Sequence, residues 1–395
     1  MSPDSEAWDA VIAGGGIQGL TLAAEAAERG LRVLLLEAGG FGAGSTAASY
    51  GIVHGGFRYW QDLDLVRLLR SRIEQAWFLR SFPGLVRPLR CVLPFYEADR
   101  AKPKLFAVAA AMDRMGSALA GRLAPHLAAP GLPAPRLLGR AELLELAPWL
   151  RPQSVRGAGC WHDAEITDPP ALVEALLARA RLAGATCLAG SAVRQLRLAP
   201  DGRVAGVLAR DTASGEAREF RAPVMVNCAG AGLQDLARAG HPGGPGFFRP
   251  LRAWNLHLSH PTATLPAAFA IGTGRRLFVR PSAMGLHAGT FYGAEDVPGW
   301  LAALDAAAPG LGLGTARVQR VSQGVVPDGA QALEPAHRDV ILDHGREGGP
   351  RGLFSVSGVK LTTARWLSRR AVARIWPASR PQPARAPGRL ADARA

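Results

Sequence analysis

The chain has 395 residues, 48% hydrophobic and 20% charged, a composition typical of a globular protein with a large core. Its formal net charge is +14, carried mostly by arginine spread along the chain. No apolar run reaches the ~18–20 residues of a membrane-spanning helix, and no basic segment leads into an apolar one as in a secretory signal. Nucleic-acid binding is disfavoured, because no known motif is present and aromatic residues do not alternate with the basic ones.

The cysteines are scattered and form no C-x-x-C pair; they are Cys91, Cys160, Cys187 and Cys228. This spacing argues against a zinc site and a disulfide framework and is typical of the reducing cytoplasm. We therefore expect no metal site and a cytoplasmic location. The arginine surplus has two explanations: a GC-rich genome, or attraction to an anionic membrane surface. A peripheral contact at the inner membrane face stays an open alternative.

The first predicted elements form a strand, a glycine turn and a helix. Residues 10–13 are a short apolar run that suits a buried parallel strand. Gly14, Gly16 and Gly19 then match the G-x-G-x-x-G spacing of dinucleotide-binding proteins. In that motif the first glycine permits the tight turn, the second admits a pyrophosphate and the third allows helix and strand to pack closely. A helix over residues 17–29 would present its positive end to the phosphates.

A second strand over residues 33–36 ends at Glu37, where a carboxylate can accept hydrogen bonds from ribose hydroxyls. An acid at this place disfavours a 2′-phosphate, so FAD or NAD is expected rather than NADP. Residues 40–58 are rich in Gly, Ser, Thr and Ala. They predict a close-packed irregular loop that directs hydroxyls and backbone amides at a polar group.

The remaining pattern predicts alternating helices and strands. Amphipathic helices are expected over residues 63–79, 105–127 and 168–183, the last begun by Asp168 and Pro169. Strands are expected over 86–96, 186–189, 192–198, 203–210, 217–221 and 224–227, with a Pro/Gly/Ala connector at 125–135 and a further sheet over 247–295. Residues 377–395 are rich in Pro, Arg and Ala and are predicted to be disordered.

Three motifs stand out beyond the glycine turn. They are His54-Gly55-Gly56-Phe57-Arg58-Tyr59, the run over 86–94 (VRPLRCVLP) and the run over 352–365 (GLFSVSGVKLTTAR). In this order they resemble the H-G-G-x-R-Y, V-R-P-L-x-x-V-L-P and G-G-K-L-T-T-Y-R motifs of FAD-dependent glycerol-3-phosphate dehydrogenases. Those enzymes belong to the D-amino-acid-oxidase-like flavoprotein superfamily. The resemblance spans about residues 8–375, so we expect the helical C-terminal domain of the family to be lacking.

The resemblance implies an α/β (mixed α+β) fold, in which a Rossmann-like FAD-binding domain is interleaved with a mainly antiparallel substrate domain. We expect FAD-binding parts at 1–85, 151–240 and 321–376, substrate or cap parts at 86–150 and 241–320, and a disordered tail at 377–395. The residues expected to bind FAD are Gly14, Gly16, Ile17, Gly19, Glu37, Ala38, Ser45, Thr46, His54, Gly55, Gly56, Val193, Ala229, Gly230, Gly358, Val359, Lys360, Leu361 and Thr362.

Arg58, Arg338 and Lys360 match family residues that surround the flavin and the substrate. Two other family positions have changed: Val326 takes the place of an arginine that helps to hold the substrate phosphate, and Asn255 takes that of a histidine. His257, two residues further on, is a candidate base, and Arg280 is an added charge that would offset the lost arginine or bind a carboxylate. These changes argue that the substrate is not simply glycerol 3-phosphate.

The roles of His54 and of the residues around His162 have alternative interpretations. His54 is interpreted as a structural donor, a flavin contact, a covalent anchor or a base. The group of His162, Asp163 and Glu165 resembles a ligand set, but a solvated loop is the favoured reading.

The resulting hypothesis is an FAD-dependent oxidoreductase that oxidises a small anionic substrate at a CH–OH carbon by hydride transfer to flavin N5. Oxygen or a quinone would accept the electrons. The alternatives are an amine or amino-acid (CH–NH) oxidase or dehydrogenase and, in another class, a flavin-binding protein without turnover.

Overall fold

The computed structural model describes residues 7–60, 63–124, 130–151, 154–259, 265–272, 277–329 and 333–379. The chain forms two compact units. Unit 1 comprises Met1–Ala47, Pro169–Leu251 and Val325–Ala395, and unit 2 comprises Ala48–Asp168 and Arg252–Gly324. Within the described residues, no helix combines the length and the apolar character needed to cross a bilayer.

Unit 1 contains a six-stranded sheet in the order β17-β18-β11-β1-β2-β7. Its strands are β1 (Ala10–Ala13), β2 (Val33–Leu36), β7 (Thr186–Leu188), β11 (Met225–Asn227), β17 (Val340–Asp343) and β18 (Leu353–Ser357). All neighbours are parallel except β17, which runs antiparallel to β18. β1 and β2 are buried along their whole length, as expected for apolar strands covered on both faces.

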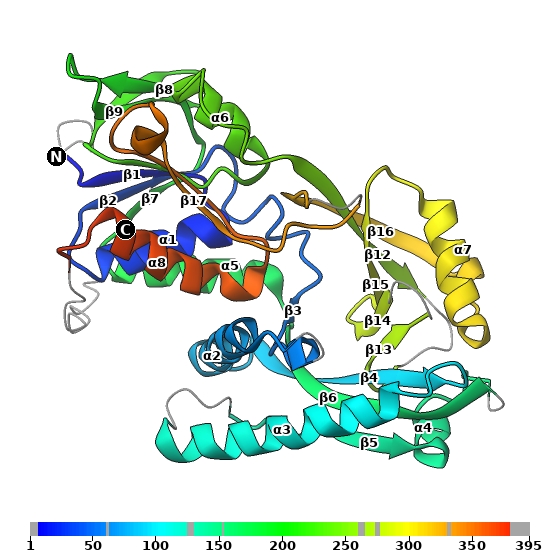
Figure 1. The fold of residues 1–395 in the computed structure, drawn as a ribbon. Helices are drawn as coiled ribbons and strands as arrows, with labels where there is room; N and C mark the ends of the chain where they lie inside the picture. Colours follow the sequence, from blue (N-terminus) through cyan, green and yellow to red (C-terminus); the bar gives the residue numbers. More distant parts are fainter. Residues whose placement is uncertain are drawn as a thin grey trace, which may run out of the picture. The chain divides into compact units, whose positions relative to one another are not determined.

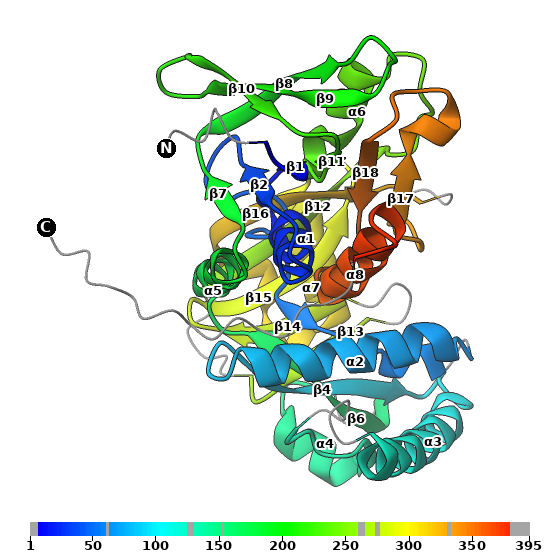
Figure 2. The same cartoon turned by 90° about the vertical axis from the view of Figure 1, so that its left-hand side faces the viewer.

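Helices cover one face of this sheet, and a second sheet covers the other (Figures 1 and 2). The helices are α1 (Ile17–Ala27), α5 (Pro169–Leu182) and α8 (Ala364–Ile375), with α1 between the other two. The second sheet contains β8 (Ser191–Leu198), β9 (Val204–Asp211) and β10 (Ala217–Arg221), and α6 (Leu233–Gly240) lies beside it. Val11, Ala13, Val207 and Phe220 belong to the core between the two sheets.

Unit 2 is built on a nine-stranded sheet that follows the order β16-β12-β15-β14-β13-β4-β6-β3, with β5 also paired to β6. The strands are β3 (Ile52–Val53), β4 (Val86–Tyr96), β5 (Arg136–Gly139), β6 (Val155–Ile166), β12 (Pro250–Ser259), β13 (Ala268–Ile271), β14 (Leu277–Ser282), β15 (Gly285–Tyr292) and β16 (Arg317–Pro327). The β4–β6 pair is antiparallel and runs from Val86 opposite Ile166 to Tyr96 opposite Val155.

The helices of unit 2 are α2 (Leu65–Ser81), α3 (Lys102–Leu123), α4 (Arg140–Leu146) and α7 (Val297–Ala307). Asp64 caps α2 by accepting a hydrogen bond from the Arg67 amide, and Asp296 caps α7 in the same way through Gly299. Trp300 and Leu304 of α7 pack into the core formed with Trp254 and Phe269 of the sheet.

These observations confirm the expected α/β fold with an interleaved, mainly antiparallel second sheet. The element bounds shift slightly: the first helix ends at Ala27 rather than residue 29, and the helix expected over 105–127 occupies Lys102–Leu123. Residues 125–129 of the expected connector and 380–395 of the expected tail lie outside the described residues.

The two compact units and the expected domain parts have different boundaries. Residues 48–85, 151–168 and 321–324, expected in the FAD-binding parts, belong to unit 2. The reason is pairing: Ile52 of β3 lies opposite Glu165 of β6, and β6 in turn pairs with β4 along its length. Residues 241–251, expected in the substrate part, belong to unit 1.

Candidate functional site

The glycine turn of unit 1 has the geometry that its spacing predicts. Gly14 has a φ of +106°, and a Cβ built there would lie 2.5 Å from the carbonyl oxygen of Cys228. A Cβ on Gly19 would lie 1.8 Å from the carbonyl oxygen of Gly14. Gly16 precedes the first turn of α1 and has no side-chain cap. The turn therefore leaves backbone space at the helix N-terminus, where a phosphate is favoured.

Glu37 directly follows β2, next to this turn. One carboxylate oxygen accepts a hydrogen bond from the Gly15 amide at 2.6 Å, and the other accepts from the Gly39 amide at 2.7 Å. The exposed Ala38 follows it. The carboxylate is thus fixed at the end of the strand, and its remaining lone pairs suit ribose hydroxyls.

Ser45 and Thr46, the two loop residues expected to bind FAD, form hydrogen bonds with other segments of unit 1. The Thr46 hydroxyl accepts from the Ile17 amide at 2.9 Å, at the first turn of α1. The Ser45 hydroxyl donates to the carbonyl of Val325 and accepts from its amide, at 2.7 and 2.8 Å. Both hydroxyls therefore hold the loop against the glycine turn and the end of β16.

Ala229 and Gly230 lie in the turn after β11, beside the glycine turn. The Cys228 amide donates to Ala13, and the side chain of buried Asn227 accepts from the Ala229 amide. Val193 lies in β8 and packs on the core of unit 1. Two residues before it, the Ser191 amide donates to the Glu37 carbonyl, so the start of β8 adjoins the acid of the fingerprint.

A third turn follows β18 and brings Arg338 and Lys360 to one end of the β17–β18 pair. Val340 lies opposite Ser357, and the Asp339 carboxylate accepts from the Val359 amide at 3.3 Å. Arg338 is exposed and Lys360 is half-buried. Leu361 and Thr362 continue into a single helical turn before α8.

Gly358 in this turn lies against α1. A Cβ on it would be 3.1 Å from Oε1 of Gln18, a buried oxygen with no hydrogen-bond partner among the described residues. The amide nitrogen of Gln18 donates to the Ser368 hydroxyl of α8 at 2.8 Å. Turns after β1, β11 and β18 thus meet at the carboxyl edge of one parallel sheet, the usual ligand-binding edge of such sheets.

These residues fit FAD. Three features carry this fit. The first is the open backbone at Gly16, where an added Cβ would lie 3.2 Å from the Thr46 hydroxyl. The other two are the N-terminus of α1, which follows Gly16, and the Glu37 carboxylate at the end of the neighbouring strand. A pyrophosphate and a ribose need these three features.

In unit 2, the H-G-G motif is held by Asp163. Its carboxylate accepts from the Gly55 amide at 2.7 Å and contacts Nδ1 of His54 at 3.0 Å. Burial by itself raises the pKa of Asp163, but these hydrogen bonds outweigh it and the pKa lies below its usual value. Added Cβ atoms on Gly55 and Gly56 would collide with Gln75 and Ser71 of α2. The motif therefore has a packing role in this unit.

This arrangement corrects the interpretation of residues 162–165 as a solvated loop. They belong to β6, where Asp163 and Glu165 are 3% and 6% exposed. The sheet buries these carboxylates, and each finds basic or backbone donors on neighbouring strands. Arg58, which follows the motif, is exposed, with its guanidinium 5.4 Å from the centre of the Tyr59 ring.

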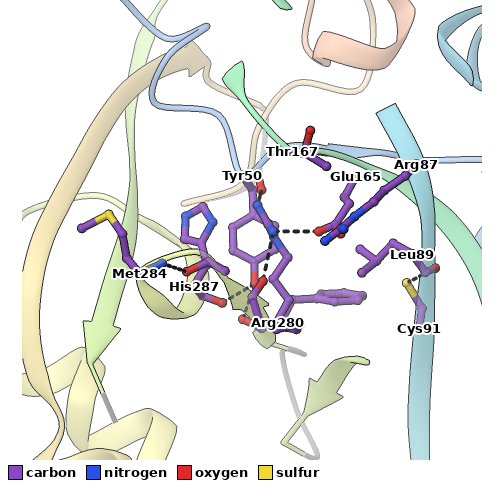
Figure 3. A network of polar contacts seen from close by, with 12 residues as sticks. Tyr50, Arg87, Leu89, Cys91, Glu165, Thr167, Arg280, Met284 and His287 are labelled. Atoms are coloured by element: carbon purple, nitrogen blue, oxygen red, sulfur yellow. Dashed lines mark hydrogen bonds and ion pairs between the residues drawn. The ribbon is translucent and has the colours of Figure 1, made fainter. Parts of the chain in front are cut away.

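Arg280 of β14 is engaged inside unit 2 (Figure 3). Its guanidinium forms an ion pair with Glu165 at 3.1 Å, donates to the Tyr50 carbonyl at 2.8 Å and lies over the Tyr50 ring. Arg87 binds the other oxygen of the same carboxylate at 2.7 Å. These contacts favour a structural role for Arg280 over the expected clamp.

Asn255 and His257 occupy neighbouring same-face positions of β12 but differ in their contacts. Asn255 donates to the Ala48 carbonyl and accepts from Thr290, so its amide is used within the fold. Nε2 of His257 lies 3.0 Å from both the Ser322 hydroxyl and the Arg320 guanidinium. Burial, followed by the charges of Arg320 and Arg280, lowers the pKa of His257 to about 4.

The sequence-based interpretation does not predict the roles of four residues that organise these sites: Gln18, Asp163, Asp339 and Arg320. Two signals were available, because Asp339 follows Arg338 directly and because Arg320 and Ser322 alternate along one strand. Asp163 stands out in the sequence only as a candidate ligand, and Gln18 does not stand out at all, because the partners of both residues are distant in sequence.

Comparison with known proteins agrees with this geometry. The chain matches the family model described as "DAO: FAD dependent oxidoreductase" over residues 9–370. It is 28% identical to an alpha-glycerophosphate oxidase of Streptococcus pyogenes, covering 73% of this chain and 46% of that protein. It is 30% identical to a glycerol-3-phosphate dehydrogenase of Mycobacterium leprae, covering 59% and 38%. The chain thus spans less than half the length of these relatives.

Solved structures share the fold. The glycerol-3-phosphate dehydrogenase of Bacillus halodurans, complexed with FAD, aligns with a TM-score of 0.69 at 21% identity, covering 94% of this chain and 65% of that one. Glycine oxidase from Geobacillus kaustophilus aligns with a TM-score of 0.66 at 19% identity, covering 94% and 95%. The family match extends over nearly the whole chain and agrees with the turns at the edge of the parallel sheet: the protein belongs to the DAO family of FAD-dependent oxidoreductases.

Proposed function

We propose that the protein oxidises a small anionic substrate at a CH–OH carbon. The observation that carries this proposal is the hydrogen bond between Asp339 and the Val359 amide. It holds Arg338 and Lys360, two cations, on adjacent turns at the ligand-binding edge of the parallel sheet. An anionic substrate and a developing negative charge both require fixed cations.

When bound, the flavin supplies a hydride acceptor at its N5 atom. The protein's own groups must position the substrate and neutralise charge. Half-buried Lys360 is suited to stabilise an anionic oxygen, and exposed Arg338 to bind an acidic group of the substrate. His257 is a poor base as it stands, because Arg320 donates to its Nε2 lone pair. A water molecule therefore remains the alternative proton acceptor.

Anaerobic reduction of the flavin tests the proposal. The purified yellow protein would be mixed with 2-hydroxy acids, polyol phosphates and amino acids, and the loss of flavin absorbance would be followed. We expect reduction by a hydroxylated anion, slowed roughly a hundredfold by Lys360→Ala if the lysine contributes about 3 kcal/mol to the transition state. Reduction by neutral alcohols alone would contradict the proposal.

The second candidate is CH–NH oxidation of an amine or amino acid. Two solved structures that share the fold are named for such activities: glycine oxidase from Geobacillus kaustophilus and L-proline dehydrogenase from P. horikoshii. Asn255 and Val326, which depart from the glycerol-3-phosphate dehydrogenase motifs, also favour it. Reduction by amino acids but not by their hydroxy-acid counterparts would select this candidate.

We further propose that α3 makes a peripheral contact with an anionic bilayer, as suits an enzyme that passes electrons to a quinone. Exposed apolar side chains recur every three or four residues along this helix: Leu105, Val108, Met112, Met115, Leu119 and Leu123. The basic residues of this helix are Lys102, Lys104, Arg114 and Arg122. Its one acidic residue, Asp113, is buried and paired with Arg72. An antiparallel pair of such helices would bring like charges together, so anionic lipid suits the surface better than a second copy does.

Sedimentation with vesicles checks this contact. Binding to vesicles of anionic phospholipid should weaken steeply with salt. The double variant Met115→Glu/Leu119→Glu should lose binding, whereas Leu182→Glu, at an exposed leucine of α5, should retain it. Equal recovery with neutral and anionic vesicles at low salt would contradict the proposal and leave oxygen the simpler acceptor.

A further inference from the structure

One serine of the loop over residues 40–47 makes a contact that cofactor binding does not require. The Ser45 hydroxyl donates to the Val325 carbonyl at 2.7 Å and accepts from the Val325 amide at 2.8 Å. Both residues belong to unit 1, although 280 positions separate them in the sequence. A hydroxyl has a single proton, and here the Val325 carbonyl takes it. The contact therefore favours a role for Ser45 other than donating to a phosphate.

The partner of Ser45 is the backbone of a strand edge. Val325 lies near the end of β16, which is an edge strand of its sheet. On the free side of an edge strand the N–H and C=O groups lack the partners that a further strand would supply. The Ser45 hydroxyl bonds both groups of one residue. Since Ser45 and Val325 are only half-buried, water can replace this contact, and it can open at a modest cost.

The loop that is fastened in this way borders the space expected for the pyrophosphate. Thr46 accepts from the Ile17 amide at 2.9 Å, and a Cβ built on Gly16 would lie 3.2 Å from the Thr46 hydroxyl oxygen. Nearer the start of the loop, the Gly42 amide donates to the Gly15 carbonyl at 2.9 Å. The loop thus follows the glycine turn into the first turn of α1, and a phosphate at this helix N-terminus would lie next to it.

Hydrogen bonds rather than packing hold the tip of the loop. Ala43, Gly44 and Ala47 are exposed, and a Cβ built on Gly44 would meet nothing within 4 Å. Few buried apolar contacts and an exposed backbone are the features of segments that open locally at low free energy. The two hydrogen bonds of Ser45 are therefore a large part of what keeps this tip closed.

We propose that Ser45 is the latch of this loop: it sets the rate at which FAD enters and leaves, and contributes little to FAD affinity. The inference rests on membership of the FAD-dependent family and is independent of the proposed oxidation. Because the latch involves no atom of the cofactor, it stabilises the closed loop equally with and without FAD. Loss of two hydrogen bonds should raise the open population about tenfold to a hundredfold, and should speed association and dissociation by the same factor.

The kinetics of flavin exchange test the latch without turnover. Flavin-free protein would be mixed with FAD, and the quenching of flavin fluorescence would give the association rate. Dissociation of bound FAD would be followed in an excess of an FAD analogue with a shifted absorbance. In Ser45→Ala we expect both rates to rise at least about tenfold while Kd stays within about threefold. Ser45→Thr keeps the hydroxyl and should restore slow exchange.

Ser214→Ala is the matched control. The Ser214 hydroxyl also donates once and accepts once, to Asp211 and from the Glu216 amide, in an exposed turn of unit 1. This variant should leave both rates within about twofold, as is usual for a surface substitution.

Two results would overturn the latch. One is faster dissociation with unchanged association, because the affinity would then fall by the full factor and Ser45 would be part of the cofactor site itself. The other is unaltered rates in both directions. If flavin-free Ser45→Ala protein does not fold, hydrogen exchange of the FAD-loaded protein replaces the association measurement. The Ile17 and Gly42 amides, which bond to or from the loop, should exchange faster than in the unaltered protein, and equal exchange would contradict the proposal.

Discussion

At the scale of single residues, Gly19 has the tightest surroundings of the fingerprint, since a methyl group would overlap the Gly14 carbonyl. Gly19→Ala should therefore yield largely flavin-free protein and cost about 1–3 kcal/mol of stability through overpacking. The ratio of flavin to protein absorbance and the thermal midpoint measure both effects. Gly40→Ala is the control, because its added Cβ meets nothing within 4 Å. A fully yellow Gly19→Ala protein would show that α1 can move away from β1.

The Arg280–Glu165 pair gives a second prediction at this scale. Arg280→Met leaves the buried carboxylate of Glu165 with only the more exposed Arg87, and should destabilise the protein by about 3–5 kcal/mol. Adding Glu165→Gln removes the stranded charge and should restore part of the stability. Urea unfolding of both variants measures this. Equal stability of the single and double variants would show that Arg87 alone neutralises the carboxylate.

At the scale of elements, His344 connects three parts of unit 1. Its Nε2 contacts the Ser355 hydroxyl of β18 at 2.9 Å, and its Nδ1 faces His241 after α6. Burial, then the neighbouring His241, lowers the pKa of His344 to about 4. In the unfolded chain a histidine titrates near 6.5. The unfolded state thus binds more protons between these values, and the stabilising contribution, complete above pH ~6.5, is lost as the pH falls towards 4.

Unfolding free energies measured between pH 7.5 and 5 should accordingly decrease with falling pH, and His344→Gln should flatten this dependence. His337→Gln, at an exposed position, should leave it unchanged. Since His257 titrates in the same window, some dependence should remain. A slope that His344→Gln does not alter would contradict the assignment.

At this scale, the sequence predicts structure that arises from interactions within one short segment better than structure that arises from contacts between distant segments. The strand–turn–helix over residues 10–27 was predictable because hydrophobic period, glycine spacing and the acid at position 37 act within one short segment. The role of Asp163 was not, because the strand β6 buries it only after pairing with β4, which is distant in sequence. For the same reason the sequence does not predict that Arg280 pairs with Glu165, which comes from another strand.

At the scale of the whole molecule, removal of FAD should loosen the ligand-binding edge of unit 1 more than its core. Hydrogen exchange of the flavin-free protein should rise most in residues 14–19, 37–46, 228–232 and 358–362, whose turns end the parallel strands. The strands β1 and β2, fully buried between two layers, should change little. Mass spectrometry of peptides before and after acid removal of the flavin gives the comparison. Unchanged exchange in all four turns would contradict the cofactor assignment.

The chain alternates between the two units, and this affects the order in which the protein can form during translation. β1 lies beside β11, with Ile12 opposite Val226, and β11 lies beside β18, with Val226 opposite Phe354. The glycine turn leaves the ribosome early, but the turns that adjoin it are synthesised after most of unit 2. Because we expect Gly358 and Lys360 to contact the flavin, we predict that a nascent chain binds it firmly only after this segment has emerged from the ribosome.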